Sequence, residues 1–171
     1  MKKLLKSTFI LLFTSILLFL GYQIISRINY KKEVQKNIKT IPEFDYTDVN
    51  GKNFTQNNLK KATPVLFIYF NTECEYCNIE TKMIKDNIEK LKTIQLIFIS
   101  FEEPEKIIRF AQTYQLLNRD NIHFLYDKQV SFATTFDVTA LPTIVIYDRQ
   151  KQLIEKIKGQ VKIDHILKKI K

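Results

Sequence analysis

The chain is 171 residues long and 45% hydrophobic, which is enough for one well-buried domain and an appendage. Its three glycines and four prolines argue against a disordered or low-complexity chain. The net charge of +9 would suit a nucleic-acid-binding protein, but residues 1–40 alone hold eight basic residues and one acidic residue. The remaining residues carry 19 basic and 17 acidic side chains, so the sequence does not indicate nucleic-acid binding.

An uncharged apolar segment, residues 9–25, follows a short cationic opening. At helical rise its 17 residues span about 26 Å, near the lower limit for crossing a bilayer. A cleaved signal peptide and an uncleaved membrane anchor both fit this pattern. The anchor, residues 1–27, is favoured because no small-residue cleavage site follows, no cysteine is available there for lipid attachment and basic residues flank both ends.

A basic segment, residues 28–40, is interpreted as a membrane-proximal spacer that leads to a folded domain over residues 41–171. Basic residues on both sides of the apolar segment do not decide its orientation. A signal-like start before a long domain usually carries that domain across the membrane. We therefore expect a single-pass protein of the cytoplasmic (inner) membrane with its domain on the extracytoplasmic, or periplasmic, side.

The pattern of residues 41–171 predicts an α/β fold. Residues 44–47 and 52–55, on either side of a turn that contains Asn50-Gly51, form a hairpin. Two continuous apolar runs, residues 65–70 and 94–100, are typical of strands buried on both faces of a sheet. Further strands are expected over residues 122–125, 143–147 and 153–157, and helices over residues 78–91, 102–117, 129–136 and 161–170. This order predicts a central mixed β-sheet flanked by helices, with the hairpin as an N-terminal extension.

Apolar residues at helical spacing predict the buried faces of the first two of these helices. The expected buried residues are Ile79, Met83, Ile84, Ile88 and Leu91 in the first, and Ile107, Phe110, Ala111, Tyr114 and Leu117 in the second.

The two cysteines of the chain, Cys74 and Cys77, stand at the junction of the first apolar strand and the helix that follows. A Cys-x-x-Cys in this position is a thioredoxin-like redox signature. At the mouth of a helix, unpaired backbone N–H groups and the positive dipole end favour a thiolate on Cys74. Cys74 is then the nucleophile towards a partner's disulfide, and Cys77, one turn along, resolves the mixed disulfide. The neighbouring carboxylates of Glu73 and Glu75 oppose the thiolate.

Other uses of the cysteine pair remain as alternatives. A structural zinc site normally needs four ligands, and only His123 and His165 could join the cysteines. An inert disulfide would close too small a loop to constrain the unfolded chain much. A copper-binding or copper-delivery module that uses Cys74, Cys77 and a histidine is the alternative function, although copper carriers of this fold typically space their cysteines by three residues.

Several segments together resemble the TlpA/ResA-like thiol-disulfide oxidoreductases of the thioredoxin-like superfamily. In order along the chain these segments are Pro42-Glu43-Phe44, residues 48–52, residues 59–64, the strand 65–70, Cys74-Glu75-Tyr76-Cys77, and Leu141-Pro142-Thr143 with Asp148. The resemblance covers about residues 41–171 and implies a thioredoxin-like fold, a membrane anchor and an extracytoplasmic domain. It also implies no bound cofactor, and it implies protein thiol or disulfide substrates with an upstream thiol electron donor for a protein that we expect to be a monomer.

The resemblance adds two site residues and one anomaly. Pro142 should follow a cis peptide bond from Leu141 and lie against the dithiol, and Glu80 should act beside Cys77. Glu80 lies one helical turn after Cys77, where a half-buried carboxylate could accept the Cys77 proton. Thioredoxins place a buried aspartate six residues before the first cysteine, where this chain has Ile68. The relatives usually carry a tryptophan directly before the first cysteine, where this chain has Glu73.

Overall fold

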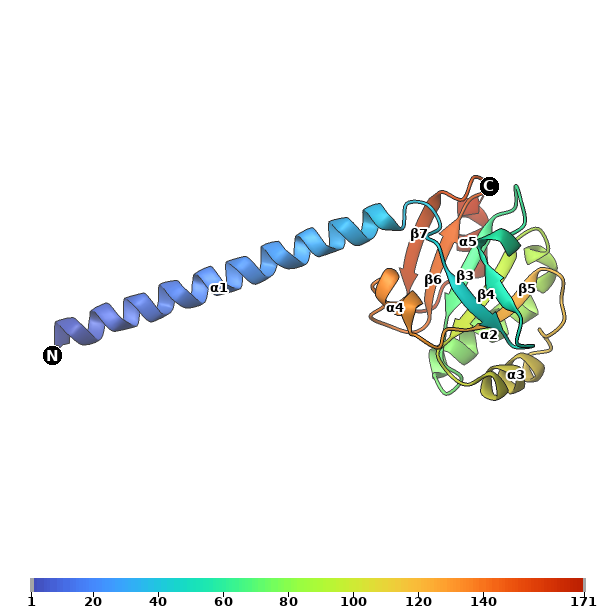
Figure 1. The fold of residues 1–171 in the computed structure, drawn as a ribbon, viewed down its shortest axis with the longest axis horizontal. Helices are drawn as coiled ribbons and strands as arrows, with labels where there is room; N and C mark the ends of the chain where they lie inside the picture. The colour runs from blue at the N-terminus through green and yellow to red at the C-terminus, as the bar shows by residue number, and fades with distance from the viewer. Residues whose placement is uncertain (1, 171) are drawn as a thin grey trace. The chain divides into compact units, whose positions relative to one another are not determined.

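The computed structural model describes residues 2–170 of the chain, which divides into one compact unit that ends at Lys36 and a second that begins at Asn37 (Figure 1). The first unit is the helix α1, Lys2–Asn37. From Phe9 onward it is long and apolar enough to cross a membrane. The predicted spacer over residues 28–40 is mostly helical, because the chain from Tyr22 to Ile41 has neither glycine nor proline to end the helix.

The second unit is built on one seven-stranded mixed sheet in the order β2-β1-β5-β4-β3-β6-β7. The neighbours β3, β4 and β5 run parallel, and the other pairings are antiparallel. The strands are β1 Asp45–Asp48, β2 Asn53–Thr55, β3 Val65–Tyr69, β4 Gln95–Ser100, β5 Ile122–Tyr126, β6 Thr143–Tyr147 and β7 Leu153–Lys158. The helices are η1 Gln56–Asn58, α2 Glu75–Asp86, η2 Ile88–Leu91, α3 Pro104–Thr113, α4 Ser131–Thr135 and α5 Ile163–Ile170.

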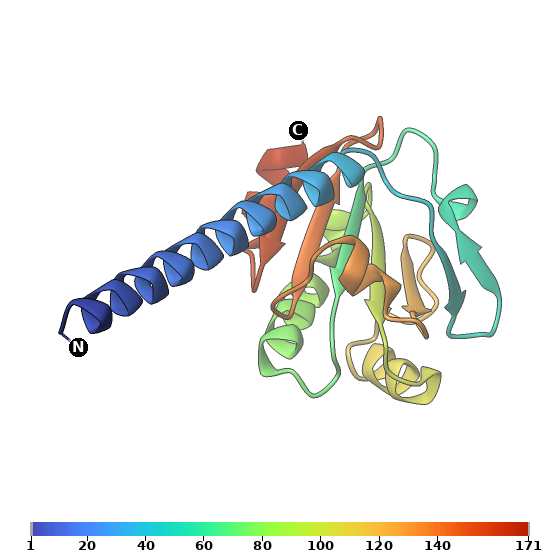
Figure 2. The same cartoon turned by 60° about the vertical axis from the view of Figure 1, so that its left-hand side comes forward.

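Both faces of the central strands are buried, as their continuous apolar runs predicted. Leu66 and Ile68 of β3 point into the main core, which α2, α3 and α5 complete from one side of the sheet. The alternate residues Phe67 and Tyr69 point to the other side, where their rings contact Phe132 of α4 (orange in Figure 2). Strand β3 therefore lies between two apolar layers.

The start of the second unit is fixed to the far edge of the sheet. The buried hydroxyl of Tyr147 donates to the carbonyl oxygen of Ile38 at 2.9 Å, and the N–H of Leu153 donates to that of Lys39 at 2.8 Å. The predicted hairpin of β1 and β2 is confirmed, and its turn uses Gly51 at a φ of 82°, a conformation that glycine adopts without strain.

Helices α2 and α3 differ from the expectation at their ends and in single residues of their buried faces. The expected core positions Ile84, Leu91, Ile107, Phe110 and Ala111 are buried. Helix α2 begins at Glu75 and ends at Asp86, because Asn87 turns its side chain back to the carbonyl oxygen of Met83 at 3.0 Å and closes the helix. Its buried face is Cys77, Glu80, Thr81 and Ile84, and Ile79 is exposed. Helix α3 ends at Thr113, and Leu116 rather than Leu117 is fully buried.

Candidate active site

Cys74 is the N-cap of α2, at the end of the loop that follows β3. Its Sγ accepts a hydrogen bond from the N–H of Cys77 at 3.3 Å, one of the backbone donors that a helix start leaves unpaired. The side chain is partly exposed, and both cysteines are free thiols. A sulfur that is accessible and also faces backbone N–H groups suits a nucleophile, as the sequence predicted.

Cys77 lies behind Cys74 and is only 1% exposed. Burial raises the pKa of its thiol well above the ordinary range, and a hydrogen bond with Cys74 raises it further. Nearby Glu102 acts in the same direction, while the backbone of Asn71 opposes it. The two sulfurs are therefore unequal, with an accessible one in front and a buried, protonated one behind.

The peptide bond between Leu141 and Pro142 is cis, which confirms the expected geometry at this position. The Cys74 thiol donates to the carbonyl oxygen of Leu141 at 3.8 Å, so this loop lies against the dithiol. The carbonyl oxygen of Pro142 accepts from the N–H of Gly159 at 2.8 Å, which ties the loop to the end of β7.

Glu80 is fully buried, whereas the sequence predicted a half-buried side chain. Its Oε2 accepts from the N–H of Val161 at 2.9 Å, and its Oε1 has no hydrogen-bond partner within the described part of the chain. Burial raises the pKa of this carboxyl to about 7, and the Val161 hydrogen bond only partly opposes the rise. Glu80 therefore gains and loses a proton near neutral pH, one helical turn from Cys77.

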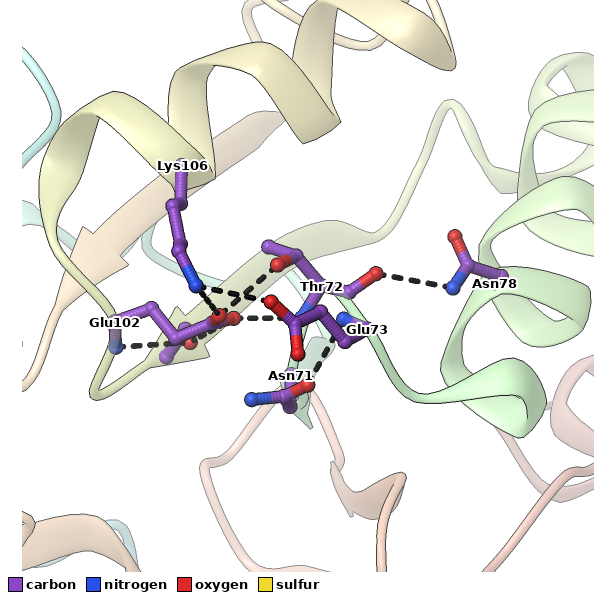
Figure 3. A network of polar contacts seen from close by, with 7 residues as sticks. Asn71, Thr72, Glu73, Asn78, Glu102 and Lys106 are labelled. Carbon is purple, nitrogen blue, oxygen red and sulfur yellow. Dashed lines mark hydrogen bonds and ion pairs between the residues drawn. The ribbon is translucent and has the colours of Figure 1, made fainter.

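The loop before Cys74 is held by residues that the sequence did not single out (Figure 3). The carboxylate of Glu102, just after β4, accepts from both the backbone N–H and the hydroxyl of Thr72. The side-chain amide of Asn78 donates to the carbonyl oxygen of Thr72. The sequence placed Glu102 only at the start of the helix expected over residues 102–117, together with two other glutamates.

Glu73, directly before Cys74, is exposed and forms an ion pair with Lys106 of α3, with 3.1 Å between Nζ and Oε1. A solvent-exposed pair of this kind contributes little stability. Tyr76, in the first turn of α2, is 60% exposed.

The two histidines do not join the cysteines. Nε2 of His123 lies 3.2 Å from the amide nitrogen of Gln95, and Nε2 of His165 lies 3.1 Å from a carboxylate oxygen of Glu155. Within residues 2–170, no group of three or more histidine, cysteine, aspartate or glutamate residues gathers as a metal site would require. The geometry gives the copper-delivery alternative no support.

This fold, with a paired-cysteine helix start facing a cis-proline loop, defines a protein-disulfide oxidoreductase of the thioredoxin-like class. The sequence profile of the AhpC/TSA family matches residues 38–156, and the chain belongs to that family. It is 27% identical over 132 residues to the thiol-disulfide oxidoreductase ResA of Bacillus cereus, which covers 75% of this chain and 73% of the relative. It is 26% identical over 109 residues to the thioredoxin-like protein SkfH of Bacillus subtilis, covering 63% and 77%.

Solved structures agree on the fold. A secreted disulfide oxidoreductase of Mycobacterium tuberculosis superposes with a TM-score of 0.63 at 17% identity, over 74% of this chain and 93% of that one. A thioredoxin-like protein from Aeropyrum pernix superposes with a TM-score of 0.61 at 18% identity, over 86% and 97%.

Proposed function

We propose that this chain reduces disulfide bonds of proteins outside the cytoplasmic membrane, to which α1 anchors it. Cys74 is the nucleophile, Cys77 the resolving thiol and Glu80 the proton acceptor, and Pro142 lies in the loop against which the dithiol works. The observation that carries the proposal is the arrangement along α2, where the buried Cys77 and Glu80 lie one turn apart behind the partly exposed Cys74.

The chemistry proceeds in two exchanges. The Cys74 thiolate attacks one sulfur of the partner's disulfide, the partner's S–S bond breaks, and its other sulfur leaves as a thiolate that takes up a proton. Cys77 then gives its proton to the Glu80 carboxylate and attacks the Cys74 sulfur. The partner's remaining sulfur leaves as a thiolate and is protonated. Two electrons have passed from the dithiol to the partner, and an upstream thiol donor must return two electrons before the next turnover.

The surroundings of the accessible sulfur support the reducing direction. Strongly oxidising dithiol proteins owe their high reduction potential to a stabilised reduced form, in which a thiolate on the accessible cysteine is strongly favoured. Here two carboxylates, those of Glu73 and Glu75, flank Cys74 in the chain, and negative charge beside the sulfur works against such a stabilised reduced form.

The test of direction is the reduction potential of the Cys74–Cys77 pair, measured by equilibrating the protein with glutathione buffers of defined ratio. We expect a value close to that of thioredoxin, about −270 mV. A value near that of a strong oxidant, about −120 mV, would contradict the reductase proposal.

The site residues are tested by trapping. Cys77→Ser should accumulate a mixed disulfide between Cys74 and its partner, because the resolving attack is lost. The matched variant Cys74→Ser should trap nothing. Equal trapping by both variants would contradict the division of roles, and the trapped protein identifies the substrate.

The location is tested by labelling in intact cells. A membrane-impermeant maleimide should modify a cysteine placed at exposed Lys52 in a Cys74→Ser/Cys77→Ser background without permeabilisation. Labelling only after permeabilisation would place the domain on the cytoplasmic side.

A further inference from the structure

Thr72 anchors the loop that carries Cys74. Its N–H and its hydroxyl both donate to the carboxylate of Glu102, at 2.6 Å and 2.9 Å. Its carbonyl oxygen accepts from the side-chain amide of Asn78 at 3.1 Å. All three polar groups of Thr72 are therefore occupied by residues outside the loop, from opposite sides, as Figure 3 shows.

Glu102 belongs to a separate part of the chain, 30 residues away from Thr72. Only 7% of its side chain is exposed, and an unpaired carboxylate at that depth would be costly. Besides Thr72, its oxygens face the hydroxyl of Ser100 at 3.4 Å and the Nζ of Lys106 at 3.5 Å. Lys106 supplies the compensating positive charge and also reaches Glu73, so one cation joins the buried carboxylate to the residue beside Cys74.

The opposite end of α3 completes the support. Tyr114 is the C-cap residue of α3, and its hydroxyl donates to Oδ1 of Asn78 at 2.7 Å. Asn78 also donates to the carbonyl oxygen of Cys74 at 2.9 Å. An open groove of about 310 Å³ lies between the loop and α3, with Thr72, Asn78, Lys106 and Tyr114 among its lining residues. Helix α3 is itself packed in the main core through Ile107, Phe110 and Ala111, so the hydrogen bonds join the loop to a fixed element.

We infer that Glu102 is a positioning residue for disulfide exchange, which holds the Cys74 loop through Thr72 so that the sulfur stays at the start of α2. The inference rests on the proposed role of Cys74 as nucleophile. Without the carboxylate, Thr72 loses the partner of both its N–H and its hydroxyl, and only the contact with Asn78 still holds this residue. Cys74 then spends less time where the Cys77 N–H faces its sulfur, and attack on a disulfide slows.

The experiment measures the second-order rate constant of Cys74 with 4,4′-dithiodipyridine, using the full chain in detergent with Cys77→Ser as the background. Rates are expressed per folded molecule, with the folded fraction taken from pulse proteolysis. We expect Glu102→Ala to lower the rate constant about tenfold, since small misplacements of a reacting group cost factors of this order. Glu102→Gln keeps one acceptor oxygen for Thr72, so its rate constant should be about fivefold below that of the background rather than tenfold.

Thr72→Val tests whether Glu102 acts through Thr72. It removes the hydroxyl donor and keeps the N–H, so we expect a loss of about threefold. If the two residues act as one unit, the Thr72→Val/Glu102→Gln double variant should lower the rate constant by a smaller factor than the product of the two single factors. Glu105→Gln is the matched control, because it removes an exposed carboxylate from the first turn of α3, three residues after Glu102, and should leave the rate unchanged.

Rates within twofold of the background for both Glu102 variants would overturn the inference, whatever happens to stability. A fall in stability with an unchanged rate per folded molecule would also overturn it, because the residue would then be only structural. Should Glu102→Ala fail to fold, the Gln and Val variants decide the question. A background protein that does not react at all would instead contradict the role of Cys74, which separates the two failures.

Discussion

Replacing Glu80 by glutamine should mainly change how the free energy of unfolding depends on pH. Burial raises the pKa of Glu80 from its ordinary 4.5 to about 7 in the folded chain. Between these values the unfolded chain has lost the proton and the folded chain keeps it, so folding stability falls as pH rises. At 1.36 kcal/mol for each pH unit, the total loss between pH 4.5 and pH 7 is about 3 kcal/mol.

Glu80→Gln removes this titration. The amide nitrogen is left without a partner where Oε1 stood, which costs about 1–3 kcal/mol at every pH. The informative quantity is therefore the difference between two pH values, in which that constant cost cancels. Relative to the unsubstituted protein, the variant should gain about 3 kcal/mol in unfolding free energy between pH 4.5 and pH 8.5.

The assay is urea-dependent pulse proteolysis of the reduced full chain in detergent at a series of pH values. Glu75→Gln, an exposed glutamate in the first turn of the same helix, controls for the loss of a carboxylate. If the difference between Glu80→Gln and the unsubstituted protein stays within about 1 kcal/mol across this range, the carboxyl does not titrate near neutrality. Its assignment as proton acceptor for Cys77 would then fall as well.

Three further predictions concern residues outside the redox centre. Phe98→Ala should lower the unfolding free energy by about 3–5 kcal/mol, because this fully buried ring lies in the main core; a loss below 1 kcal/mol in urea titration would contradict that packing. Asp127→Ala should cost about 2 kcal/mol in the same assay, since its carboxylate accepts from Ser131 and Phe132 at the start of α4, and Asp127→Asn should recover part of the loss. Burial lowers the pKa of His123 below its ordinary 6.5 in the folded chain. Between the folded and the unfolded pKa, the unfolded chain binds the proton and the folded chain does not, so stability falls as pH falls. His123→Gln should flatten that acid limb, and an unchanged limb would show that the imidazole titrates normally.

The architecture could be predicted because the central strands are continuous apolar segments in the sequence. Residues 65–70 and 94–100 are unbroken apolar runs, and the structure forms strands over Val65–Tyr69 and Gln95–Ser100. The face of α2 could not be predicted in the same way, because two of its four buried residues are the polar Glu80 and Thr81. Polar residues interrupt the apolar stripe on this face. Of the residues expected there, Ile84 and Leu91 are fully buried and Met83 and Ile88 pack against the core, while Ile79 is exposed.

The site residues also divide into those that the sequence could predict and those that it could not. Cys74 and Cys77 are neighbours in sequence, and Pro142 was reached through resemblance to a family, so none of the three required knowledge of distant contacts. Glu102 stands at the start of the helix expected over residues 102–117, a position that it shares with the acidic Glu103 and Glu105. What separates Glu102 from them is contact with a residue 30 positions earlier, and no local pattern carries that information.

The two buried carboxyl groups near the dithiol are set apart by the partners of their oxygens. Glu80 has one oxygen on the Val161 N–H and one with no partner in the described residues, which leaves a site where a proton can be taken up. Both oxygens of Glu102 are engaged by donors, Thr72 among them, so this carboxylate serves as an acceptor that holds the loop. The pH profile of insulin reduction should separate the two roles. Glu80→Gln should abolish the change in rate near pH 7, whereas Glu102→Gln should lower the rate by a similar factor at every pH. An exchange of these two profiles would reverse the assignment of proton acceptor and positioning residue.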